Sequence, residues 1–445
     1  MGRKHGDRPQ CPRGAEGRRD TVASPHVFAR WAYNAGIMCT HTHSPKNYPS
    51  RRTILSTIVP AAFLAGKISA QSGPDMAERF RQMSADYEKK GLAEPYKGIT
   101  TDGTVEPGLF HLQATGVSTE PVRHAAEKFL ASLTKEQRDR TMFAIDDPEW
   151  RKWMNQHFYV RQGVSLKEMT ETQRAAAFGL LSASLSARGM KLTRDIMKLN
   201  ETLAELSDDH QFLGEYFYYF TVMGKPSATE PWGYQLDGHH AIINYFVRGD
   251  QVVMTPYFTG SEPVTATSGK YKGITILQNE QNRGLEMLLA LDEKQREKAV
   301  LNPVKTKNYN LTEAWQDNVV LDYAGARVAD FTPKQRGQLL ELVELYVGNM
   351  DAGHTRVKMD EVMWHHERTH FAWIGGSEPD SVFYYRIHSP VILIEFDHQT
   401  PANLRKFAKD QLPNRQHIHC VVRTPNGNDY GKDLLRQHYL AHVHV

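Results

Sequence analysis

The sequence predicts an α+β fold, with a helical N-terminal third and a mainly antiparallel sheet formed by two strand groups. Apolar residues recur at helical spacing over about residues 118–206. Two later regions, 211–263 and 370–423, are rich in β-branched and aromatic residues separated by turn residues. Helical spacing returns between them, at 280–300 and 332–349. We expect the strands of each group to pair antiparallel and the two sequence-distant groups to join in one sheet.

Residues 1–70 are interpreted as an N-terminal extension that contains a twin-arginine (Tat-type) signal segment. Arg51 and Arg52 precede a short apolar run, and Ser69-Ala70 offers the small residues of a cleavage site. The apolar run is too short to span a bilayer as a helix. We therefore expect an exported protein, periplasmic or extracellular, without membrane contact after signal removal, whose residues 71–445 form a single α+β domain.

Charge and cysteine content narrow the classes of partner. Residues 1–70 hold 11 of the 54 Lys and Arg but 3 of the 51 Asp and Glu, so the remaining chain is mildly acidic. A nucleic-acid-binding domain would carry a basic stripe, so no nucleic-acid partner is expected. Cys420 is the only cysteine beyond residue 70, which excludes an internal disulfide there. A small-molecule substrate or ligand is the expected partner, and the oligomeric state stays open.

One phrase recurs at four places where a helix is expected to begin. An apolar residue precedes Thr or Asp, and a Gln-Arg pair begins three residues after that Thr or Asp. In such a capping box the Thr or Asp accepts from the third helical N–H while the Gln reaches back to the cap. The four phrases are Leu133–Arg138, Met169–Arg174, Leu291–Arg296 and Phe331–Arg336. Their unequal spacing favours four similar helix starts over a solenoid repeat.

The first strand group contains one candidate ligand. Strands are predicted at Glu215–Val222, Ala241–Val247 and Gln251–Tyr257. The stretch from Thr255 to Pro263 is predicted as a loop. His239 and His240 stand at the start of the middle strand. Because successive strand residues face opposite ways, only one of them enters a given site, and we select His240.

The second strand group contains the other candidate ligands. Strands are predicted at Ser381–Ile387, Pro390–Phe396 and His417–Arg423. Alternate strand residues share a face, so His417 and His419 point the same way. Imidazoles and carboxylates at strand ends predict a site for a divalent transition metal, with zinc, iron, copper and manganese as the candidates. The predicted ligands are His240, Glu395, His398, His417 and His419.

Neighbouring residues supply candidate catalytic groups for a metal-dependent hydrolase or oxidoreductase. Arg423, like Arg386, is suited to hold an anionic substrate. Asp429 and Tyr430 are suited to proton transfer. A purely structural interpretation of Asp429 stays open, because Pro-Asn-Gly-Asn-Asp is typical of a turn and Asp429 is a favourable cap for a following helix.

Two other functions are compatible with the sequence. His366-Glu367-Arg368-Thr369-His370 matches H-E-x-x-H, in which two histidines one helical turn apart bind zinc and the glutamate acts as base. This zincin-like metallopeptidase requires one continuous helix over 364–373. The other alternative is a non-catalytic periplasmic protein that binds a small molecule or a metal in an aromatic pocket. The candidate pocket residues are Trp232, Tyr234, Tyr257, Phe258 and Trp373.

Several longer phrases resemble one known family. They include Gly238-His239-His240, Tyr384-Tyr385-Arg386-Ile387, Ile394-Glu395-Phe396-Asp397-His398-Gln399, and the stretch from His417 to Gly431. Over nearly all of residues 75–440, the chain resembles a bacterial and fungal family catalogued as a domain of unknown function, DUF3500. The resemblance implies one coherent folding unit and no established reaction. The H-E-x-x-H pentapeptide is not part of the family pattern.

Overall fold

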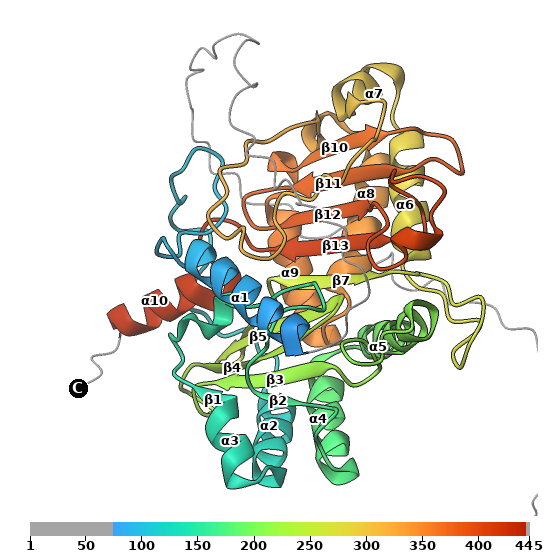
Figure 1. Cartoon of the computed structure of the whole chain (residues 1–445). Helices are drawn as coiled ribbons and strands as arrows, with labels where there is room; N and C mark the ends of the chain where they lie inside the picture. The colour runs from blue at the N-terminus through green and yellow to red at the C-terminus, as the bar shows by residue number, and fades with distance from the viewer. Residues whose placement is uncertain (1–73, 442–445) are drawn as a thin grey trace, which may run out of the picture. The chain divides into compact units, whose positions relative to one another are not determined.

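Strands from the two predicted groups join in one mixed sheet of 13 strands, with helices packed against it (Figure 1). This computed structural model describes residues 74–441, so the predicted signal segment at residues 1–70 lies outside the described residues. These described residues form one compact unit. The predicted α+β class and the joining of the two strand groups in one sheet are confirmed.

The first half of the sheet, here called the N-terminal half, is built from residues 120–261. Its elements are α2 (Glu120–Ser132), α3 (Lys135–Thr141), β1 (Met142–Phe143), β2 (Val164–Ser165), α4 (Glu171–Ser184), α5 (Ala187–Ser207), β3 (Tyr218–Met223), β4 (Trp232–Gly238), β5 (Ala241–Arg248), β6 (Gln251–Val253) and β7 (Tyr257–Ser261). Helix α1 (Pro74–Gly91) precedes this half in the chain.

Residues 278–423, here called the C-terminal half, repeat this order of elements except that they have no strand equivalent to β6. They form α6 (Gln278–Leu289), α7 (Glu293–Ala299), β8 (Val300–Asn302), β9 (Ala326–Arg327), α8 (Pro333–Val347), α9 (Ala352–Trp364), β10 (His370–Gly375), β11 (Phe383–His388), β12 (Leu393–His398) and β13 (Ile418–Arg423). Helix α10 (Lys432–Ala441) follows. Within residues 74–441, no helix is both long enough and apolar enough to cross a membrane.

The strand pairing repeats as well. β1 runs parallel to β3 as β8 runs parallel to β10, and β2 and β9 pair antiparallel with the same two strands. Each half then continues as an antiparallel meander, β3-β4-β5-β7 and β10-β11-β12-β13. β7 and β13 pair antiparallel and join the halves in the middle of the sheet. Two like halves joined by an antiparallel pair are related by an approximate two-fold axis between β7 and β13.

The four recurring helix-start phrases occupy equivalent positions in the two halves. Capping boxes are present at the starts of α3, α4, α7 and α8. Gln173 Nε2 donates to Gln137 Oε1 at 2.7 Å, and Gln335 Nε2 donates to Gln295 Oε1 at 2.8 Å. The helix starts are therefore confirmed, but they also mark a repeat. Two of these helix starts lie in each half. The number of residues between successive starts is therefore unequal, and the two-fold repeat is not visible as a constant sequence spacing.

The two faces of the sheet differ in character. Helices such as α6 and α8 cover one face of the sheet (Figure 1). Aromatic and aliphatic residues, such as Tyr385, are buried on this face. The opposite face carries polar strand residues such as Asp397, covered by the loops at 144–163 and 303–325. Backbone N–H groups of these loops donate to carboxylates on the strands. Buried polar groups must find hydrogen-bond partners, and most of the predicted site residues lie on this polar face.

Two predicted elements differ from the structure. Trp232–Gly238, which was not among the predicted strands, forms strand β4 and is buried throughout. The expected loop at Thr255–Pro263 contains β7, which lies in the middle of the sheet. Strands buried on both faces lack the alternation of apolar and polar residues that reveals a strand in sequence.

Candidate metal centre

Three histidine side chains, contributed by both halves, converge beside the β7–β13 pair. His240 lies in the two-residue turn between β4 and β5, His417 directly precedes β13, and His419 lies within β13. The Nε2 atom of His419 lies 3.2 Å from Nε2 of His240 and 3.1 Å from Nε2 of His417. All three residues are buried. The predicted proximity of His240 to His417 and His419 is confirmed.

A glycine makes room for two of these rings. Gly260 on β7 pairs with His419 on β13. A Cβ atom at Gly260 would lie 2.6 Å from the Ile418 carbonyl oxygen and 3.2 Å from the Cδ2 atoms of both His240 and His419. Any side chain there would push the strands or the imidazoles apart. The Gly260 N–H also donates to the His240 carbonyl at 2.8 Å, so the same residue fixes the turn.

The Nδ1 atoms of His417 and His419 each hydrogen-bond to an oxygen acceptor. His417 Nδ1 lies 2.7 Å from the Thr400 carbonyl oxygen, and His419 Nδ1 lies 2.6 Å from Glu313 Oε1. A carbonyl or carboxylate oxygen accepts a hydrogen bond, so each Nδ1 carries the proton and each Nε2 keeps its lone pair. Imidazole rings that bind metals are oriented in the same way by carboxylates and backbone carbonyls.

The geometry of the triad suits a metal ion. One ligand nitrogen from each histidine lies within 4.8 Å of the other two. Two imidazoles on a tetrahedral zinc ion, with Zn–N bonds of about 2.0–2.1 Å, place their nitrogens roughly 3.3 Å apart. Burial lowers the pKa of His240 and of His419 and favours the neutral imidazole, the form that binds metals. The triad His240, His417 and His419 is therefore able to hold a metal ion.

Glu313 is the functional candidate that the sequence did not reveal. It lies in the loop at 303–325, and its Oε1 accepts from Asn310 Nδ2 at 2.8 Å as well as from His419. Burial raises the pKa of Glu313 to about 7, while the hydrogen bond from Asn310 opposes this shift. No motif surrounds Glu313 in the sequence, because its position depends on how a loop folds over the sheet.

Two further histidines extend the row of imidazoles. The His239 ring stacks on His240 with centroids 3.9 Å apart, and His157 lies 5.5 Å from His239. His239 Nδ1 lies 2.8 Å from Asn200 Oδ1, so this ring is directed away from the three converging Nε2 atoms. The doublet His239-His240 signalled this neighbourhood in the sequence, whereas His157 carried no signal.

Comparison with known proteins decides the family. The chain matches the family described as "Protein of unknown function (DUF3500)" over residues 115–432. It belongs to the DUF3500 family. The match spans both halves of the sheet and all three histidines of the triad. No curated protein and no solved structure matches the chain.

Two of the predicted ligands of this DUF3500 protein lie away from the triad. The Glu395 carboxylate accepts from two N–H groups of the loop at 303–325 and from the Tyr384 hydroxyl, so it anchors that loop. His398 lies on the opposite, helix-covered face of β12, where Nε2 lies 2.9 Å from Gln281 Oε1. His398 Nδ1 accepts from a backbone amide of β11. Neither side chain joins the three converging imidazoles.

The three predicted catalytic residues form a separate buried network. Arg423 Nε lies 2.7 Å from Asp429 Oδ2, and Arg423 Nη2 lies 2.7 Å from Asp317 Oδ1. The Tyr430 hydroxyl donates to Asp317 Oδ1 at 3.0 Å. Arg423 lies four residues beyond His419 on β13, or about 13 Å along a strand. Asp429 thus neutralises Arg423 instead of capping a helix, and the catalytic role of these residues stays a prediction.

The H-E-x-x-H hypothesis is wrong. Helix α9 ends at Trp364, a 3-10 turn covers His366–Arg368, and β10 begins at His370. His366 and His370 therefore do not lie one turn apart on a common helix. The β-branched and aromatic residues after His370 pair with β11, and this pairing in the sheet ends the helical segment.

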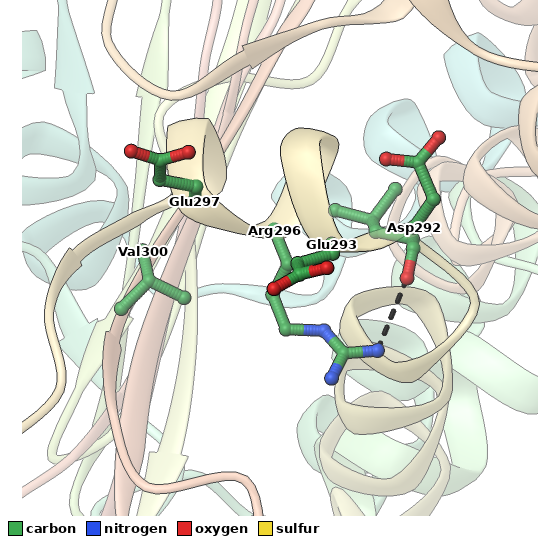
Figure 2. A pocket seen from close by; sticks show the side chains of 6 residues that line it. Asp292, Glu293, Arg296, Glu297 and Val300 are labelled. Carbon is green, nitrogen blue, oxygen red and sulfur yellow. Dashed lines mark hydrogen bonds between the residues drawn. The ribbon is translucent and has the colours of Figure 1, made fainter.

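A surface pocket lies at α7, away from the triad (Figure 2). It is lined by Leu291, Asp292, Glu293, Arg296, Glu297 and Val300. Strands β12, β11 and β10 separate β13 from β8, which follows α7. The aromatic residues predicted to line one binding pocket do not share a pocket, although Tyr257 lines a small cavity. All five are buried: Trp232, Tyr234, Tyr257, Phe258 and Trp373. Phe258 is the one that packs on the triad, with its ring centroid 5.0 Å from that of His419.

Proposed function

We propose that this protein is a metal-dependent enzyme, a hydrolase or an oxidoreductase, whose ion is held by His240, His417 and His419. The observation that supports this most strongly is the convergence of three Nε2 atoms at 3.1 and 3.2 Å. Buried structural histidines usually direct both ring nitrogens at other groups, whereas these Nε2 atoms face one another. Three imidazole ligands leave a position open for water or substrate, as in catalytic zinc sites.

The ligand set favours zinc, copper or iron. Imidazole suits these three metals, whereas manganese prefers oxygen ligands and is the weakest fit among the predicted metals. Cys420 follows His419 on β13 and so faces the opposite side of the sheet, which leaves no thiolate in the set. When bound, such an ion supplies a Lewis acid or a redox centre.

The surrounding residues have defined tasks in this proposal. The Thr400 carbonyl and the Glu313 carboxylate orient two rings so that Nε2 points toward the ion. The Glu313 side chain keeps 24% of its surface exposed, so it is more accessible to solvent than the three histidines. When ionised, this carboxylate would compensate part of the charge of the ion.

Elemental analysis by inductively coupled plasma mass spectrometry tests the proposal on the purified protein. The parent is compared with His419→Gln and with the matched control His398→Gln. His398 is also a buried imidazole on an adjacent strand, but it lies outside the triad. Stoichiometric metal is expected in the parent and the control, and loss of that metal is expected in His419→Gln.

Two outcomes would overturn the proposal. Metal retained by a folded His419→Gln variant would place the ion elsewhere. A parent without metal, whose melting temperature does not rise when zinc, copper or iron is added, would favour a protein that binds a small molecule without a metal. Far-UV circular dichroism establishes that each variant is folded.

We also infer that the enzyme is exported and acts on a small molecule outside the cytoplasm, without a nucleic-acid or membrane partner. The support is the Arg51-Arg52 pair before an apolar run, together with the mildly acidic chain beyond residue 70. A fusion of residues 1–70 to a reporter that requires twin-arginine export tests this. Export of an Arg51→Lys/Arg52→Lys fusion as efficient as that of the parent fusion would contradict the inference.

A further inference from the structure

A buried arginine on β11 lacks a carboxylate partner. Arg386 is 4% exposed. Within the described residues, Arg386 Nη2 donates a long hydrogen bond to the Asp322 carbonyl oxygen at 3.4 Å, and Arg386 Nε has no partner. Burying a guanidinium without a counter-charge is strongly unfavourable, so this position calls for an anion.

A second polar side chain on the same strand is also unsatisfied. His388 shares a face with Arg386, is 1% exposed, and has no partner for Nδ1. The Tyr323 ring lies 4.7 Å from the His388 ring and stacks on His370 at 4.8 Å with an interplanar angle of 9°. Arg386 and His388 thus offer unused nitrogen atoms beside a pair of stacked rings.

The neighbouring carboxylates are engaged elsewhere. Glu395 lies opposite Arg386 in the strand register, but its oxygens accept from the loop at 303–325 and from a tyrosine hydroxyl. The Asp322 carboxylate accepts from the N–H of the next residue at 2.7 Å. Glu106 forms a two-bond ion pair with Arg368. None of these groups neutralises the Arg386 guanidinium at ion-pair distance.

The N-terminal half shows how the same strand position is satisfied internally. Gln235 pairs with Asn244 across β4 and β5 as Arg386 pairs with Glu395 across β11 and β12. Gln235 Nε2 donates to Asn244 Oδ1 at 2.7 Å and to the Trp150 carbonyl at 3.1 Å. The loop at this position therefore completes the bonds of the glutamine, and no ligand is needed.

The second position shows the same contrast. Asp237 pairs with Ile242 as His388 pairs with Leu393, so Asp237 and His388 are equivalent in the two halves. Asp237 forms an ion pair with Arg161 Nε at 3.2 Å, whereas His388 Nδ1 has no partner among the described residues. The fold can satisfy both positions within the chain, and only the C-terminal half leaves them open.

We propose that Arg386, His388 and Tyr323 form a binding site for an oxyanion group, carboxylate or phosphate, of a small molecule. The guanidinium presents a planar set of donors that matches two oxygen atoms of such a group. His388 Nδ1 supplies a further hydrogen-bonding atom, and the stacked Tyr323 and His370 rings give a flat surface for the rest of the molecule. The site lies on β11, two strands from β13, and does not depend on the proposed metal.

Thermal unfolding in inorganic phosphate, succinate or chloride at equal ionic strength tests the site. The melting temperature of the parent is expected to rise by a few degrees in phosphate or in succinate relative to chloride. Arg386→Gln, which introduces the residue of the N-terminal half, is expected to lose this rise. The matched control is Arg283→Gln, because Arg283 is an exposed arginine paired with Glu286 on α6; it is expected to keep the rise.

Comparing the two anions identifies the chemical group that binds, and the melting temperature in chloride shows whether Arg386 has a structural role. A rise in phosphate alone assigns a phosphate group, and a rise in succinate alone assigns a carboxylate. Because the guanidinium has no counter-charge, Arg386→Gln in chloride is expected to melt no lower than the parent. A large fall in chloride, an equal anion response in both proteins, or no response in the parent would overturn the proposal. The metal content of Arg386→Gln is expected to match the parent.

Discussion

The N-terminal and C-terminal halves share an order of elements and a strand register, yet they carry different residues at equivalent positions. The turn between β4 and β5 contains His239-His240, and the equivalent turn between β11 and β12 contains Pro390-Val391. His240 belongs to the triad and contacts the His419 ring, whereas Val391 is buried in an apolar cluster. The fold therefore does not require an imidazole at this turn, which argues that His240 serves a function other than folding.

The central strands differ in the same way. Ile242 pairs with Phe258 in the N-terminal half as Leu393 pairs with Arg423 in the C-terminal half. Phe258 packs against the ring of His419, whereas Arg423 is held by two carboxylates. One backbone arrangement thus supports an apolar wall for the triad in one half and a buried ionic network in the other.

The largest expected effect on metal binding comes from removing His240, the residue that the N-terminal half contributes to the triad. His240 has a φ of 65°, a conformation that Asn adopts more readily than most residues, so His240→Asn removes the imidazole with little backbone strain. Removing a group that hydrogen-bonds to a metal ligand lowers metal affinity by about 10–100-fold. Removing the ligand itself should therefore lower the affinity by on the order of 100-fold or more. Competition with a chelator measures the affinity. An unchanged value would show that the C-terminal half holds the ion alone.

A substantial effect on stability is expected at Arg423, the position equivalent to Phe258 of the N-terminal half. Arg423→Met leaves Asp429 buried without its cation and should lower the free energy of unfolding by about 3–5 kcal/mol. Urea unfolding measures this change. The double variant Arg423→Met/Asp429→Asn should recover part of the loss. A single variant as stable as the parent would show that the ionic network contributes nothing that an apolar side chain cannot replace.

The smallest expected effect is on stability, at two helix starts that are equivalent in the two halves. Thr170 and Thr332 cap α4 and α8 through equivalent capping boxes. Replacing either residue by Ala should lower the free energy of unfolding by about 1 kcal/mol, because each loses one cap hydrogen bond. Urea unfolding of both variants compares the two sites. If the two changes in the free energy of unfolding differed by more than about 1 kcal/mol, the two helix starts would not be equivalent.

Strand periodicity and turn residues were sufficient to predict the α+β class and the meeting of His240, His417 and His419. Histidines separated by one residue on a strand must share a face, and two apolar strand groups tend to join in one sheet. Glu395 and His398 were predicted as further ligands, but Glu395 lies inside β12 and His398 is its last residue, and neither joins the triad. Their partners, however, are loop amides and a helix side chain that no local pattern reveals.

Glu313 and the repeated architecture could not be predicted for a different reason. Glu313 reaches His419 only because the loop at 303–325 folds over the polar face, and such contacts depend on tertiary packing. The repeat lies in the order of elements and in the register, while equivalent positions carry unlike residues, such as Phe258 and Arg423. Two halves that share a backbone arrangement but carry different side chains cannot be recognised as a repeat from the sequence.

Anomalous diffraction from crystals of untagged protein, prepared without chelators, tests the metal centre most directly. Data collected on both sides of the absorption edge of the metal found by elemental analysis identify and locate the ion. The proposal predicts an anomalous peak about 2.0–2.2 Å from Nε2 of His240, His417 and His419. A peak at other residues, or only a water molecule among the three imidazoles, would contradict it.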